Sequence, residues 1–144
     1  MEARKLKSIG CDIYQREQRL IPNAAKAWEA MCIAAASDNI QLQLVSAYRS
    51  ADYQAGIIRR KLEKGQEISE ILRVSAAPGF SEHHSGRAVD ITTPGYPVLE
   101  EDFETSQAFS WLHESAAQFN FNMSFPRDNP HGVAYEPWHW AWQG

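Results

Sequence analysis

Apolar residues recur every three or four positions in three stretches of the chain, a spacing that predicts helices with one buried face. The stretches are 22–37, 51–65 and 106–119. Pro22 suits the first turn of the first helix, Ser50 the N-cap of the second, and Thr105 or Ser106 the start of the third. A shorter helix is expected around 68–72. The apolar positions that define the three faces are Ala24, Trp28, Met31 and Ala35, then Tyr53, Ile57 and Leu62, then Phe109, Leu112, Ala116 and Phe119.

Four short segments follow the two-residue period of a half-buried strand instead. The segments are 40–44, 88–92, 121–125 and 138–142. Helices and strands in this order predict an α+β domain, in which helices pack against a small, mostly antiparallel sheet. Residues 1–20 are polar and weakly periodic, so we expect an N-terminal arm or irregular lead-in there, and a single domain over 21–144.

Charge and composition narrow the functional classes. The 144 residues carry a net charge of -4, which argues against nucleic-acid binding because such proteins present basic patches. No apolar run approaches the ~20 residues of a membrane span, and no signal peptide is expected, because no apolar stretch follows the basic start. Cys32 falls on a helical apolar face, where a buried free thiol is usual; whether it pairs with Cys11 stays open. We expect a monomer.

Two histidines and an aspartate can converge on one point from three segments. If the neighbours of Asp90 point into the core, Asp90 faces the other side of its strand. His83 lies on the preceding loop, and Gly86 lets the backbone turn between them. His139 can supply a third side chain from the last strand. Two imidazoles and one carboxylate, with a fourth position left to water, form the ligand set of a catalytic Zn²⁺.

Zinc-assisted hydrolysis also needs a base and a stabilised oxyanion. Glu136, three residues before His139, is the candidate base. Residues three apart in a regular strand face opposite sides, so Glu136 must sit in a turn before the strand, which Pro137 favours. Arg49, after a strand end, can stabilise the negative charge of the carbonyl oxygen.

Each of these residues, taken alone, has a more ordinary interpretation as a surface, turn or ion-pair residue. The three tryptophans of the last strand are core residues by the same reasoning. His84 and His131 have no partner at ligand spacing, and His113 follows a core-facing leucine, so all three are left out of the metal site. The hypothesis depends on the joint occurrence of the motifs.

The motifs together resemble those of the VanY-type D-alanyl-D-alanine carboxypeptidases, a family of bacterial zinc peptidases. The family pattern runs Tyr-Arg-Ser, then Ser-x-His-x-x-Gly-x-Ala-x-Asp, then Glu-x-Trp-His. This chain has them in that order as Tyr48-Arg49-Ser50, Ser81 through Asp90, and Glu136-Pro137-Trp138-His139. The likeness covers roughly 20–144. It departs after the last histidine, where family members often carry an arginine and this chain has Ala141 and Trp142, which affects the substrate channel more than the metal.

The resemblance implies a fold shared with the Hedgehog signalling domain and a site that removes D-alanine from peptidoglycan stem peptides outside the cytoplasm. It implies Zn²⁺ held by His83, Asp90 and His139, with Glu136 as general base and Arg49 at the oxyanion. Ser81, Gln54 and Tyr48 are the implied substrate-binding residues.

Three alternatives to this activity remain. An LD-carboxypeptidase removes D-alanine from the tetrapeptide, and an endopeptidase that cuts L-alanyl-D-glutamate is disfavoured by the Glu-x-Trp-His motif. A non-catalytic peptidoglycan-binding module would keep the fold and the metal, but it would have no need of Glu136.

Overall fold

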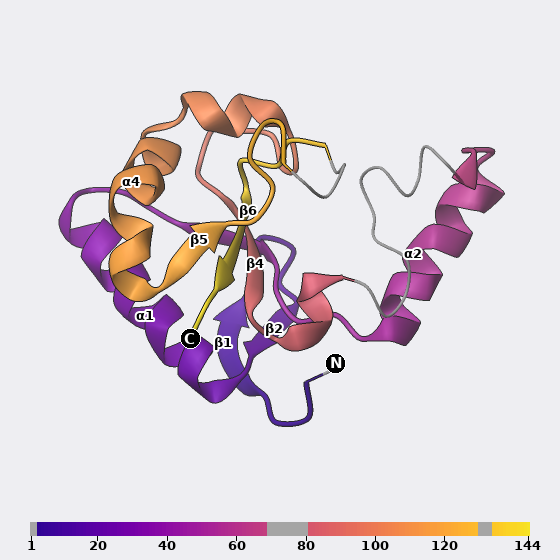
Figure 1. The fold of residues 1–144 in the computed structure, drawn as a ribbon, viewed down its shortest axis with the longest axis horizontal. Coiled ribbons are helices and arrows are strands. Elements are labelled where there is room, and N and C mark those ends of the chain that lie inside the picture. The colour runs from indigo at the N-terminus through magenta and orange to yellow at the C-terminus, as the bar shows by residue number, and fades with distance from the viewer. Residues whose placement is uncertain (1–2, 69–80, 130–133) are drawn as a thin grey trace.

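A four-stranded antiparallel sheet forms the centre of the computed structural model, which describes residues 3–68, 81–129 and 134–144 (Figure 1). Its strands are β3 (Gln43–Ser46), β4 (Ala88–Thr92), β5 (Phe121–Met123) and β6 (His139–Trp142). They lie in the order β3-β4-β6-β5. The two central strands, β4 and β6, therefore come from distant parts of the sequence. The predicted α+β architecture with a small antiparallel sheet is confirmed.

One face of this sheet packs against α1 (Pro22–Ser37) and α4 (Gln107–Ser115). Helix α4 begins where the sequence predicts, because the Ser106 side chain accepts a hydrogen bond from the Phe109 N–H at 3.0 Å. Two 3-10 helices, η2 (Glu101–Thr105) and η3 (Ala116–Phe119), flank α4. The largest side chains that are almost fully excluded from solvent in this core are Leu20, Met31, Val89, Ile91, Phe103, Leu112 and Phe121.

The third strand in the chain starts later than the alternation predicts, at Gln43 and not at Ile40. Gln43 pairs with Thr92, the last residue of β4, so the residues before it lie beyond the end of the partner strand. Ile40 and Leu42 still pack against the core as partly buried side chains. Their apolar spacing therefore reflects packing against the core and not pairing in the sheet.

The expectation of an irregular lead-in before residue 20 is wrong. Strands β1 (Lys7–Cys11) and β2 (Glu17–Leu20) form an antiparallel hairpin. Gln18 and Leu20 are the buried positions of β2, and Leu20 belongs to the core. Because the inward-facing Gln18 is polar, the strand shows no apolar alternation in the sequence.

Helix α2 (Ala51–Glu63) projects from the sheet and its covering helices (Figure 1). The Ser50 side chain caps it as predicted, by accepting from the Tyr53 N–H. The predicted buried face is wrong, since Tyr53 and Leu62 are 44% and 46% exposed, and Gln54 and Ile58 are the buried residues of the helix. The helix expected around 68–72 lies almost entirely outside the described residues.

Within the described ranges, none of the helices has the length and apolar character needed to cross a lipid bilayer. Cys11 and Cys32 are both free thiols, so the disulfide left open by the sequence is not formed. Both cysteines border the same cavity of about 440 Å³.

Candidate metal centre

The register between the two central strands places Asp90 directly opposite His139. Val89 and Trp140, the adjacent pair, belong to the core. Because successive side chains of a strand alternate between its faces, Asp90 and His139 share the face of the sheet that points away from α1 and α4. The pleat alone therefore brings a carboxylate and an imidazole together.

His83 reaches the same point from η1 (Glu82–Ser85), the 3-10 helix before β4. The Ser81 side chain caps this turn by accepting from the His83 N–H at 3.1 Å. Gly86 ends it with φ of 69°, a left-handed conformation that favours glycine. A Cβ at Gly86 would also stand 3.0 Å from Cγ2 of Ile21, so the turn needs glycine for space as well.

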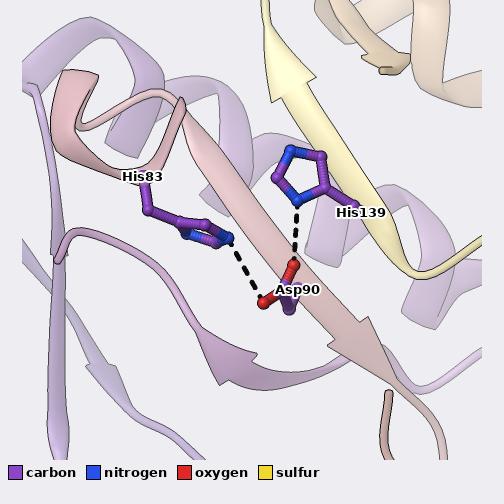
Figure 2. Close-up of side chains that lie close together, drawn as sticks. All are labelled: His83, Asp90 and His139. Carbon is purple, nitrogen blue, oxygen red and sulfur yellow. Dashed lines mark hydrogen bonds and ion pairs between the residues drawn. The ribbon is translucent and has the colours of Figure 1, made fainter. Parts of the chain in front are cut away.

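The three side chains meet at the Asp90 carboxylate, as Figure 2 shows. His83 Nε2 lies 3.3 Å from Asp90 Oδ2, and His139 Nδ1 lies 3.1 Å from Asp90 Oδ1. One ligand atom of each residue lies within 4.8 Å of the others, and all three residues are buried. The structure thus brings together the three predicted metal ligands, and Asp90 faces off the core as expected.

The cluster has the electrostatics of a cation site. Burial alone would raise the pKa of Asp90, but the neighbouring imidazoles of His83 and His139 hold that pKa well below its usual range. Burial lowers the pKa of His83 and outweighs the opposing effect of Asp90, which favours the neutral imidazole. Burial also opposes protonation of His139, yet hydrogen bonds to Asp90 and Glu82 raise its pKa to about 9. The carboxylates of Asp90 and Glu82 therefore favour a proton on His139. A metal ion at this site would place a larger positive charge beside Asp90.

Glu136 stands beside this cluster in the turn before β6, as the sequence requires. Its Oε1 lies 3.8 Å from His139 Nδ1, and its carbonyl accepts a hydrogen bond from the His139 N–H. Burial raises the pKa of Glu136 to about 7, against a lowering by the charge of His139. A carboxyl group that titrates near neutrality is suited to accept and return a proton.

Arg49 follows β3 and lies close enough to influence the pKa of both Glu136 and His83 through its charge. Its N–H donates to the His83 carbonyl at 3.1 Å. Its Nε is a buried donor that no acceptor among the described residues satisfies. This side chain therefore offers an unused hydrogen bond beside the cluster.

The three predicted substrate-binding residues lie in different local settings. Ser81 caps η1, and Gln54 is buried on α2. Tyr48 lies under the Arg19 guanidinium, which stands 5.7 Å from its ring centroid. Their assignment to a substrate stays a prediction.

Glu82 is a site residue that the sequence reasoning missed. Its Oε1 lies 2.8 Å from His139 Nε2, the nitrogen that faces away from Asp90. A carboxylate on the outer nitrogen of a histidine fixes the orientation of the ring and makes it a better ligand. The available signal was the acidic residue beside His83, inside the same motif.

The remaining histidines are outside the cluster where they are described. His84 is buried, and its Nδ1 lies 2.7 Å from the Arg49 carbonyl. His113 is exposed and stacks on Phe109. Neither belongs to the group of His83, Asp90 and His139, and His131 lies outside the described residues.

Comparison with known proteins points to one family. Residues 17–144 match the family model described as VanY, D-alanyl-D-alanine carboxypeptidase. A D-alanyl-D-alanine carboxypeptidase of Enterococcus faecalis (strain ATCC 700802 / V583) is 31% identical over 121 residues, which are 77% of this chain and 43% of that protein. The chain thus spans less than half of the length of this relative.

Solved structures agree with this match. The LdcB LD-carboxypeptidase, whose structure concerns peptidoglycan recognition, superposes with a TM-score of 0.86 at 28% identity, over 100% of this chain and 70% of LdcB. A variant of the vancomycin-resistance D,D-pentapeptidase VanY in complex with Zn(II) has a TM-score of 0.76 at 25% identity, over 100% of this chain and 81% of that one.

Proposed function

We propose, since this chain belongs to the VanY family of D-alanyl-D-alanine carboxypeptidases, that it removes the C-terminal D-alanine from peptidoglycan stem peptides with the help of Zn²⁺. One observation carries the proposal. The buried His83, Asp90 and His139 cluster has the ligand set of a catalytic zinc, and Glu136, whose pKa is about 7, stands beside it.

The residues of the cluster fit a zinc ion. His83 Nε2 is a buried nitrogen for which the described residues supply no hydrogen bond, and a neutral imidazole nitrogen is a preferred zinc ligand. Its Nδ1 lies 2.6 Å from the Ala47 carbonyl, and His139 Nε2 contacts Glu82, so both rings have an outer partner. When bound, Zn²⁺ would polarise the scissile carbonyl and lower the pKa of a water molecule.

Glu136 is the proposed proton carrier. It would accept a proton from the attacking water and then donate it to the departing amine of D-alanine. Burial gives its carboxyl group the near-neutral pKa that this double role needs, because a group far from neutrality would perform only one of the two transfers well.

Arg49 is the proposed partner of the oxyanion. Its unsatisfied Nε and its permanent charge are in place before the reaction, so the negative charge that develops on the carbonyl oxygen meets an oriented donor. Ser81, Gln54 and Tyr48 are proposed to hold the end of the peptide.

The LD-carboxypeptidase is a second candidate function, favoured by the likeness to LdcB at a TM-score of 0.86. It uses the same metal and base and differs only in the residue that precedes the released D-alanine. A peptidoglycan substrate places either activity outside the cytoplasm. We expect a monomer to suffice, because every residue proposed for the site comes from one chain.

The test is alanine release by the zinc-loaded protein from a pentapeptide that ends in D-alanyl-D-alanine and from the matching tetrapeptide, followed by mass spectrometry. Release from the pentapeptide supports the DD activity, and release from the tetrapeptide alone supports the LD activity. The matched control is the same protein after chelation of zinc, which should be inactive and regain activity on zinc addition. Zinc binding without release from either peptide would contradict the proposal.

A further inference from the structure

The N-terminal hairpin contains a buried carboxylate that the proposed reaction does not use. Asp12 is 3% exposed and lies between β1 and β2. Its two oxygens accept hydrogen bonds from four donors. These donors are the backbone N–H groups of Tyr14 and Arg16, the Arg16 Nε and the Gln18 Nε2, at distances between 2.7 and 3.1 Å. Burial would raise the pKa of Asp12, but these hydrogen bonds hold it below its usual value. The carboxylate is therefore a fixed acceptor.

Gln18 links this carboxylate to the segment that follows β3. Its Nε2 donates to Asp12 Oδ2 at 2.7 Å, and its Oε1 accepts from the Ala47 N–H at 2.8 Å. The carboxylate can only accept and the backbone N–H can only donate, so the amide of Gln18 has one satisfying orientation. Because Gln18 is 8% exposed and Ala47 is fully buried, water has little access to replace these contacts.

Ala47 in turn contacts the metal centre. Its carbonyl lies 2.6 Å from His83 Nδ1, and the N–H of the same peptide unit, on Tyr48, donates to the Arg19 carbonyl at 3.0 Å. A carbonyl can only accept, so His83 carries its proton on Nδ1 and keeps the Nε2 lone pair free on the side of Asp90. Strand β2 thus holds the peptide unit that selects the tautomer of His83.

We propose that Gln18, oriented by Asp12, is a positioning residue for the zinc ligand His83. It holds Ala47 where its carbonyl fixes the ring and the protonation pattern of His83 before the metal arrives. The inference needs only the zinc site of the proposed function, and it is independent of which peptide is cut.

The test compares Gln18→Leu with Gln41→Leu in the full chain. Gln41 is an exposed glutamine, so the control makes the same chemical change away from the site. We expect Gln18→Leu to raise the zinc dissociation constant about tenfold, the low end of the range for the outer partners of metal ligands, because Gln18 acts on His83 through Ala47. The visible absorption spectrum of the Co²⁺-substituted protein should shift as well. Gln41→Leu should leave both unchanged. Zinc affinity is measured by chelator competition and folding by thermal unfolding.

A merely structural role of Gln18 would lower the melting temperature but leave the zinc affinity and the Co²⁺ spectrum of the folded protein at their original values. That result would overturn the proposal. If Gln18→Leu does not fold, Gln18→Glu keeps the size of the side chain but sets a second carboxylate against Asp12. Near pH 8 it should weaken zinc binding by a similar factor, and an unchanged affinity would overturn the proposal as well. Absence of peptide hydrolysis would refute the proposed function and leave these binding results intact.

Discussion

The metal cluster and helix α2 are built in contrasting ways. The side chains of His83, Asp90 and His139 are 2%, 6% and 4% exposed and sit on the central strands and the adjoining turn. Helix α2 carries Gln54 but projects from the body, with Leu62 close to half exposed (Figure 1). The proposed chemistry thus lies on buried positions of the sheet and its adjoining turn, and part of the proposed peptide contact lies on a helix of which only Gln54 and Ile58 are buried.

This difference fits the separate demands of metal binding and peptide binding. A zinc site loses affinity when its ligands move by a fraction of an ångström, so it benefits from a sheet whose register is fixed by burial. An element that receives a peptide can tolerate local opening, and segments with few buried contacts supply such motion. Three substitutions test this difference.

The largest expected effect is at the metal cluster. We expect His139→Ala to abolish detectable zinc binding after dialysis, because one of the three proposed protein ligands is removed. Zinc per chain by elemental analysis gives the result. His113→Ala, which changes an exposed histidine, is the control and should retain the metal. A fully occupied site in the first variant would remove His139 from the ligand set.

The next largest effect is on the free energy of unfolding of the metal-free protein, to which Glu136 makes a pH-dependent contribution. Because the folded-state pKa of Glu136 is raised to about 7 from an ordinary 4.5, folding favours its protonated form. That contribution is complete below about pH 4.5 and is lost as the pH rises through 7. Replacement of the carboxyl by a neutral amide in Glu136→Gln should therefore stabilise the metal-free protein at pH 8 by up to about 3 kcal/mol, and have little effect at pH 4. Urea unfolding with chelator at both pH values measures this, and an equal effect at both would refute it.

The smallest effect is on the projecting helix. Leu62→Ala should change the free energy of unfolding by less than about 0.5 kcal/mol, because nearly half of the side chain is already in water. The same change at Leu112, which is fully buried on α4, should cost about 2–5 kcal/mol. Chemical denaturation of both variants makes the comparison. A loss of 2 kcal/mol or more at Leu62 would show that α2 is packed far more tightly than its exposure indicates.

The sequence predicts the site better than its surroundings. Asp90 could be placed on the face away from the core because strand alternation is strict, and Glu136 could be placed in a turn because the alternative geometry fails. Glu82 escaped notice because its role depends on the side of His139 that the carboxylate reaches, and one-dimensional spacing does not determine this.

The errors of prediction also have physical reasons. Gln18 is a polar residue at an inward position of β2, so the strand lacks the apolar alternation that would have predicted the hairpin. On α2 the apolar spacing is present, but only the side that carries Gln54 and Ile58 is buried. Periodicity identifies a helix, and tertiary packing decides which of its faces is covered.

The central claim, that Glu136 moves the proton at a zinc site it does not help to hold, is tested most directly by Glu136→Ala. The zinc-loaded variant should keep one metal ion per chain and lose at least about a hundredfold in kcat for alanine release, the usual contribution of a general base. Glu114→Ala, a change at an exposed glutamate, should retain full activity. Alanine release by the Glu136 variant at the rate of the unaltered protein, with zinc still bound, would contradict the mechanism.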